Sequence, residues 1–279
     1  MTGALVLAAA VAAAAVVPLT GRDYYATLML PFFAYSVALL GLNLMFGTTG
    51  LLSFGHALFL AVGGYTAAYL GSALRVRSLE AMLVVAMVAA VVVAVPVGWL
   101  CVRYVRIYFG MLTLAFGMLF YSFLYKFYAL TGGDEGIPVA RPLLLGRAFG
   151  DLDKTGYLVG PYYYYSLALC VVAALTMWRI VRSPLGLSLR AIRENADKAA
   201  YVGVRVRRYR FYAFVIAAVF AAAGGVLLWC RPGWRPRRWH TGRTRAISCS
   251  CSCSAASATS SAPCSAPSSS SSCKTRSCR

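Results

Sequence analysis

Long uncharged stretches alternate with short charged segments along the first 230 residues. The main runs without Asp, Glu, Lys or Arg cover residues 4–19, 24–74, 81–102, 107–125, 155–178 and 211–230. A helix rises 1.5 Å per residue and needs about 20 apolar residues to cross a bilayer. The longest run has room for two crossings, with a turn between the paired glycines Gly47 and Gly50.

The pattern therefore predicts an all-α, polytopic transmembrane helical bundle. About seven spans are expected, at approximately residues 4–19, 25–46, 51–70, 81–102, 107–128, 157–178 and 211–230. The composition agrees, because 60% of the residues are hydrophobic and only 13% are charged. Soluble domains carry about 25% charged residues, so a soluble globular protein is excluded.

Charges between the spans predict the orientation. Residues 179–210 hold nine basic and two acidic side chains, whereas residues 130–156 have a net charge of −1. Cytoplasmic loops are enriched in Lys and Arg, so residues 103–106 and 179–210 are expected inside the cell and residues 130–156 outside. On this topology Tyr157 and Tyr162–Tyr165 would form an outer aromatic belt.

Residues 231–279 differ from the rest of the chain. They contain nine basic residues, no acidic residue, 14 serines and six of the nine cysteines. Such a Ser/Cys/Arg-rich segment cannot bury a core and is predicted to be a disordered, low-complexity tail. A zinc site is a poor alternative because the cysteines at 249–253 are spaced by one residue. Binding of nucleic acid is also disfavoured, because almost no aromatic residues lie between the basic ones.

One hypothesis is that this tail is out of frame. The Ser-Cys repeat at 248–253 can be encoded by alternating UCC and UGC codons, and the same bases read two positions later encode leucine. The ancestral frame would then be lost between about Leu228 and Arg238, and the natural protein would continue with further membrane helices. The alternative is a genuine disordered tail.

Few residues offer catalytic or metal-binding chemistry. The chain has no G-x-x-x-x-G-K-[ST] motif, so it should not bind ATP as a motor domain. His56 and His240 are its only histidines, and they form no recognisable catalytic constellation. The sequence predicts no enzyme, no cofactor and no metal site.

The third predicted span combines small and polar residues. Ala57, Ala61, Gly64 and Ala68 recur at helical spacing, as expected for a tight helix-packing seam in lipid. Polar groups lie close to the glycine break, as they do around translocation paths. These candidate path residues are Thr48, Thr49, Ser53 and His56. Hydrogen bonding between helices is the competing interpretation of the histidine.

A charged segment after the sixth span is the second candidate site. Residues 183–210 begin with a turn-like Ser-Pro-Leu-Gly and continue as RAIRENADKAAYVGVRVRRYR. Ala191, Asn195, Ala199 and Val202 would share one face of a short cytoplasmic helix that stops at Gly203. Anchoring by the positive-inside rule explains the last arginines, but docking to a cytoplasmic partner also fits.

These motifs resemble a known family. The segment LNLMFGTTGLLSFGHA at 42–57 is similar to the N-terminal signature of branched-chain amino acid ABC importer permeases. Ala-Ile-Arg-Glu-Asn at 191–195 and Gly-Val at 203–204 resemble the cytoplasmic coupling segment of that family, in the form of its M-type subunit. Residues 197–203 are similar to the EAA loop of ABC permeases, and TGGDEG at 131–136 looks like the family's outer loop.

The resemblance implies a permease domain over residues 1–230, in a multi-pass protein of the bacterial inner membrane. The expected partners are a second permease subunit, two cytoplasmic ATPases and a periplasmic binding protein that delivers Leu, Ile or Val. Coupling to an ATPase would fall to Arg193, Glu194, Asn195, Asp197, Ala199 and Gly203. The family pattern continues beyond Gly224–Leu227 through further spans that are missing here. Alternatives are a urea or short-amide importer permease, a non-functional truncated product, or a stand-alone membrane protein.

Overall fold

The computed structural model describes residues 14–15, 18, 23–74, 76, 78–104, 107–127, 142–144 and 154–230. Their regular elements are helices, and the all-α class is confirmed. The elements are α2 (Asp23–Asn43), the π-helix η2 (Leu44–Thr48), α3 (His56–Ser72), α4 (Leu79–Cys101), α5 (Ile107–Lys126), α7 (Lys154–Val159), α8 (Pro161–Arg182), α9 (Pro184–Glu194), α10 (Ala196–Tyr201) and α11 (Val206–Trp229). The 131–136 motif, the tail 231–279 and all of the predicted span 4–19 except residues 14, 15 and 18 lie outside the described residues.

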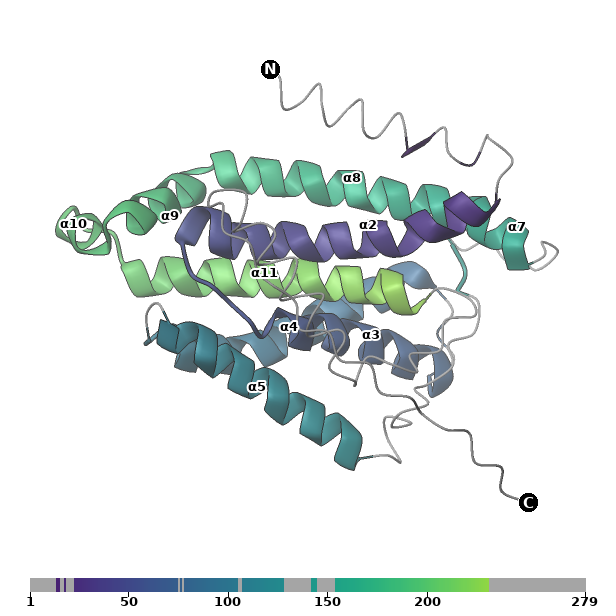
Figure 1. The fold of residues 1–279 in the computed structure, drawn as a ribbon, viewed down its shortest axis with the longest axis horizontal. Coiled ribbons are helices and arrows are strands. Elements are labelled where there is room, and N and C mark those ends of the chain that lie inside the picture. Colours follow the sequence, from purple (N-terminus) through teal and green to yellow (C-terminus); the bar gives the residue numbers. More distant parts are fainter. Residues whose placement is uncertain are drawn as a thin grey trace, which may run out of the picture.

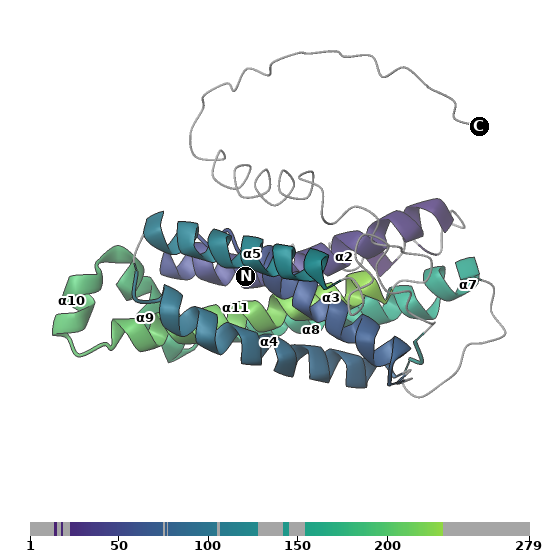
Figure 2. The ribbon, with the colours of Figure 1, turned by 90° about the horizontal axis from the view of Figure 1, so that it is seen from below.

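Five of the described helical segments are long and apolar enough to cross a membrane. They are Tyr24–Thr48, Leu79–Cys101, Ile107–Lys126, Gly156–Arg182 and Val206–Trp229. Their axes run along a common direction, with α9 and α10 at one end of the bundle and α7 at the other (Figures 1 and 2). The chain is therefore a multi-pass membrane protein, as predicted.

The last described helix, α11, occupies the centre of this bundle (Figure 1). It packs against α2, α3 and α4, and most of its Ala and Gly positions are buried. Its backbone approaches its neighbours closely. A Cβ atom on Gly63 would lie 2.2 Å from the Ala222 carbonyl oxygen, and one on Gly41 would lie 2.6 Å from that of Ala217. Glycine on these faces lets the helices meet backbone to backbone, which is how membrane helices gain packing energy.

The tyrosines near the start of α8 depart from the prediction of an outer belt. Tyr157, Tyr162 and Tyr163 are fully buried, whereas the side chain of Tyr164 is 45% exposed. The Tyr162 hydroxyl donates a hydrogen bond to the Leu227 carbonyl at 2.5 Å. That carbonyl is one of the last four of α11, which have no partner inside the helix. The tyrosine is therefore drawn into the core because it satisfies a helix terminus there.

Arginines stacked on tryptophans lie at one end of the bundle. Two guanidinium groups stack on tryptophans one turn earlier in their helices, Arg103 over Trp99 and Arg182 over Trp178, each at 4.1 Å from the ring centroid. Both pairs lie where α4 and α8 end, at the same end as α9 and α10 (Figure 1). Tryptophan favours the membrane interface and Lys/Arg the inner side, so this is the end that the sequence predicts to face the cytoplasm.

Candidate translocation and coupling site

The helical path between α2 and α3 is interrupted inside the bundle by a non-helical segment, called the break below. After η2 ends at Thr48, the chain leaves the end of α2 that lies near α9 and runs back into the bundle to reach α3 (Figure 1). Gly50 has a positive φ of 69°. The next amide, Leu51 N–H, donates back to the Met45 carbonyl at 3.2 Å. This turn prevents the helix from continuing, so α3 starts at His56 and not at residue 51 as the sequence pattern predicted.

Helix α5 covers the non-helical segment 50–55. Phe54 N–H donates to the Thr113 hydroxyl at 3.3 Å, and a Cβ atom on Gly55 would lie 2.2 Å from the Thr113 carbonyl oxygen. Thr113 is six residues into α5, which corresponds to a depth of about 9 Å along that helix. Non-helical backbone at membrane depth is tolerated only where protein or a water-filled cavity surrounds it. The packing of α5 therefore surrounds the non-helical segment with protein and allows it to lie at this depth.

The four candidate path residues lie along this break. Thr48, Thr49 and Ser53 are buried. The two threonine hydroxyls donate to carbonyls one turn earlier, Leu44 and Met45, so their hydrogen-bonding capacity is used within the helix. Ser53 Oγ and both ring nitrogens of His56 are also buried, but they have no hydrogen-bond partner among the described residues. Ser53 and His56 thus leave polar atoms free next to the break.

The candidate packing residues share one face of α3 but differ in burial along it. Gly64 and Ala68 are buried, Ala61 is half-buried and Ala57 is exposed. A Cβ atom on Gly64 would lie 2.2 Å from the Trp229 ring of α11. Within α3, Gly63 makes the close approach to the backbone of α11, and the four-residue spacing did not select it. Two spans each contain an adjacent pair of glycines, Gly63-Gly64 and Gly224-Gly225. These pairs could have indicated from the sequence that the two helices pack closely.

The charged segment forms two helices in place of the single short helix predicted. Asn195 separates α9 from α10 with extended backbone (φ −156°, ψ 105°). Its side-chain oxygen accepts hydrogen bonds from the Asp197 and Lys198 amides at 3.1 and 3.0 Å. Asparagine is a strong N-cap residue because it satisfies amides that lack a partner in the first helical turn. The cap starts a new helix where the periodic pattern predicted continuation.

Helix α10 ends at a glycine cap. Gly203 has a φ of 93°, and Val204 N–H donates to the Ala199 carbonyl at 3.0 Å, as in a Schellman motif. No atom lies within 4 Å of a Cβ built on Gly203, so the glycine is needed for its backbone conformation and not for space. Ala199 is buried, while Arg193, Glu194 and Asp197 are exposed.

Arg193 connects the charged segment 183–210 to the start of the non-helical break. Arg193 Nη1 donates a hydrogen bond to the Gly47 carbonyl, which lies in η2. The Arg193 side chain also lies 3.1 Å from the position of a Cβ atom on Gly50. The sequence assigned Arg193 to coupling but did not indicate this contact, which links residues 146 positions apart.

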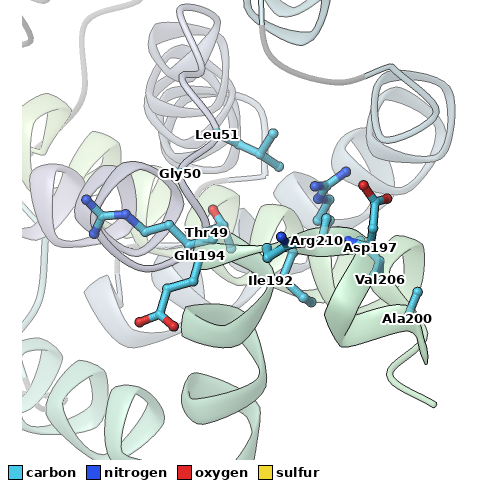
Figure 3. A pocket seen from close by; sticks show the side chains of 12 residues that line it. Thr49, Gly50, Leu51, Ile192, Glu194, Asp197, Ala200, Val206 and Arg210 are labelled. Carbon is cyan, nitrogen blue, oxygen red and sulfur yellow. Dashed lines mark hydrogen bonds between the residues drawn. The ribbon is translucent and has the colours of Figure 1, made fainter. Parts of the chain in front are cut away.

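A cavity of about 600 Å³ lies between the same two elements. Its walls come from the α2–α3 connection at Thr49 and Gly50, from Glu194 and Asp197, and from Arg210 near the start of α11 (Figure 3). Arg210 is only 8% exposed, and its Nε atom has no hydrogen-bond partner among the described residues. From the sequence, this arginine was expected to belong to the anchoring cluster. Its position near the start of the central helix could have indicated that its side chain is buried.

Removal of the Asn195 cap is expected to loosen α10. Asn195→Ala leaves two amides unpaired and should cost about 1 kcal/mol of local stability. Hydrogen–deuterium exchange of residues 196–201 should then be several-fold faster than in the unaltered chain. Asn195→Ser keeps a capping oxygen and is the matched control. Equal exchange in the alanine and serine variants would show that the cap does not hold this helix.

Comparison with known proteins adds a family match. The family model described as the permease component of branched-chain amino acid transport systems matches residues 24–238. The high-affinity branched-chain amino acid transport system permease protein LivM of Escherichia coli (strain K12) is 30% identical over 216 residues, covering 71% of this chain and 51% of LivM. LivH of the same organism is 26% identical over 204 residues, covering 70% of this chain and 66% of LivH.

More distant matches carry other names. The autoinducer 2 import system permease protein LsrC of Klebsiella pneumoniae is 30% identical over 114 residues, covering 40% of this chain and 30% of LsrC. This chain spans about half the length of LivM. No solved structure matches it.

Proposed function

Because the chain belongs to the family of permease components of branched-chain amino acid transport systems, we propose that it forms part of the membrane path of an ABC importer for branched-chain amino acids. It carries out no catalysis of its own. The observation that supports this best is the hydrogen bond from Arg193 to the Gly47 carbonyl. That bond ties the charged cytoplasmic segment to a chain break that lies inside the bundle.

The path runs beside the break. A zwitterionic amino acid needs polar partners in the membrane, and buried polar atoms without partners are costly. Ser53 and His56 supply such atoms. Beside His56, the rings of Phe59, Phe109 and Phe214 pack edge to face and are buried, so they form the packed core behind these polar atoms.

The helix pair α9–α10 is the coupling element. Its exposed residues Glu194 and Asp197 would contact a cytoplasmic ATPase, and the caps at Asn195 and Gly203 hold its shape. Movement of the pair on nucleotide binding would pass through Arg193 to the break. The other partners are a second permease subunit, a second ATPase and a periplasmic binding protein that delivers the solute.

Transport in proteoliposomes tests the proposal. The chain is reconstituted with a second permease subunit, ATPases and a binding protein of such an importer, and uptake of labelled leucine is compared with uptake of labelled urea. We expect ATP-dependent uptake of leucine only. Replacing Glu194, Asp197 and Gly203 together by alanine should lower uptake at least about tenfold and remove the stimulation of ATPase activity by solute.

Membrane insertion of this triple variant should remain normal, which its yield in the membrane fraction checks. Normal uptake by the triple variant would refute the coupling assignment. Uptake of urea in place of leucine would refute the solute assignment. An assembled complex that moves neither solute would identify the chain as a non-functional permease product.

A further inference from the structure

A second cavity lies at the cytoplasmic end, apart from the site described above. It has a volume of about 420 Å³ and lies between the end of α4 and the start of α11. Arginine and aromatic side chains dominate its walls, and no acidic residue is among the described residues that line it. The lining side chains that carry the argument are Trp99, Arg103, Arg207, Arg208 and Tyr212.

The arginines present a concentrated, solvent-accessible positive charge. Arg103, Arg207 and Arg208 are exposed, and the Arg103 guanidinium is held over the Trp99 ring at 4.1 Å. Stacking on an aromatic face leaves the edge of a guanidinium free to donate hydrogen bonds. Three such groups around one cavity complement the negative charge of a phosphate group.

The position of the cavity indicates where that phosphate comes from. Trp99 is 62% exposed in the last turn of α4, and Tyr212 is 49% exposed in the second turn of α11. Tryptophan and tyrosine at such positions sit at the level of lipid headgroups. The cavity therefore opens at the depth where phospholipid phosphates lie, on the cytoplasmic side of the membrane.

An apolar stripe leads from the cavity into the membrane. Along α4, large apolar side chains recur at spacings of four, four, three and four residues and all are exposed. Such spacing keeps them on one face of the helix. The stripe consists of Val84, Val88, Val92, Val95 and Trp99. An acyl chain lying along the valines would bring its headgroup to the arginines.

We propose that this cavity binds the headgroup of an anionic phospholipid, with an acyl chain along the exposed face of α4. Phosphatidylglycerol is the simplest lipid of this chemistry. The two helices that hold the cavity are packed closely, since a Cβ atom on Gly98 would lie 2.7 Å from the Phe214 ring. A lipid bound across their ends would therefore stabilise the contact between α4 and the central helix α11.

Lipid titration tests this proposal. The full chain, purified in detergent, is titrated with phosphatidylglycerol or phosphatidylcholine, and bound lipid is counted by native mass spectrometry. We expect a preference for phosphatidylglycerol. The triple variant Arg103→Gln, Arg207→Gln, Arg208→Gln should bind phosphatidylglycerol at least about tenfold more weakly, because each basic group near a membrane surface contributes to anionic lipid binding. Its binding of phosphatidylcholine should not change.

A matched control removes the same charge elsewhere at the same end. The variant Arg179→Gln, Arg182→Gln, Arg190→Gln also loses three arginines and one Arg–Trp pair, but it leaves the cavity intact. Its affinity for phosphatidylglycerol should fall less than about threefold. Thermal unfolding checks the fold of both variants, and Arg207→Gln alone should weaken binding several-fold if the triple variant is unstable.

Three results would overturn the proposal. An equal loss of affinity in both triple variants would mean diffuse attraction to a basic surface. Displacement of phosphatidylglycerol from the unaltered chain by excess inorganic phosphate would mean a site for free anions. Unchanged lipid binding together with loss of the contact to the second permease subunit would mean that the cavity is a protein interface.

Discussion

Replacement of Gly225 by alanine is expected to prevent the bundle from forming its native core. A Cβ atom at this position in α11 would lie 2.1 Å from the Leu60 carbonyl oxygen and 3.1 Å from the Gly64 amide nitrogen, both in α3. The obstructing atoms belong to the backbone, so no change of rotamer relieves the clash. Overpacking of a close contact costs about 3 kcal/mol or more when the backbone must move.

Thermal unfolding in detergent measures this effect. The Gly225→Ala variant should show a much lower melting temperature or a loss of monodisperse protein. Gly117→Ala is the matched control, because Gly117 also lies in a membrane-spanning helix but its Cβ would meet only Gly55 Cα, at 3.8 Å. The control should fold normally, since alanine is the better helix former. If both variants melted at the same temperature, the backbone contact between α3 and α11 would be absent.

Replacement of Arg193 by alanine should uncouple ATP hydrolysis from transport. The change removes the hydrogen bond to the Gly47 carbonyl and the packing on Gly50, so α9 loses its attachment to the chain break. Leucine uptake by the reconstituted importer should fall at least about tenfold. Hydrolysis of ATP without solute should persist, because the proposed function places the ATPase sites on other chains.

Arg190→Ala is the control for this prediction. Arg190 is an exposed arginine in the same helix, so its loss removes the same charge while the contact with Gly47 remains. Arg193→Lys should retain part of the transport activity, since lysine also donates to a carbonyl but offers a single ammonium group. If Arg190→Ala reduced uptake as much as Arg193→Ala, charge at this surface would be the cause and not the bond to Gly47.

The class of fold followed directly from the uncharged runs. A run of 20 or more residues without charge, such as 81–102, has few alternatives to a membrane helix. Details that depend on tertiary contacts did not follow. The burial of Tyr162 depends on a carbonyl 65 residues away at the end of α11, and no local pattern in the sequence encodes that partner.

The candidate sites show the same division. The glycine break near Gly50 was visible in the sequence because its turn is local, and the cap role of Gly203 was visible for the same reason. The sequence did not reveal that Thr113 shields the break, or that Asn195 divides the charged segment into two helices. In the first case the contact is long-range, and in the second the side chain of Asn195 overrides the helical periodicity on either side.

The central place of α11 has a consequence for the order of assembly during synthesis. The glycine faces of α2 and α3 are complete once residue 72 has been made, but the helix that fills the space between them ends at Trp229. At a ribosomal rate of about 5–20 residues per second, synthesis of the chain from the end of α3 to the end of α11 takes roughly 10–30 s. During this interval the surfaces around Gly41 and Gly63 face lipid or the insertion machinery. The core is thus closed late, by one helix that completes contacts with three others.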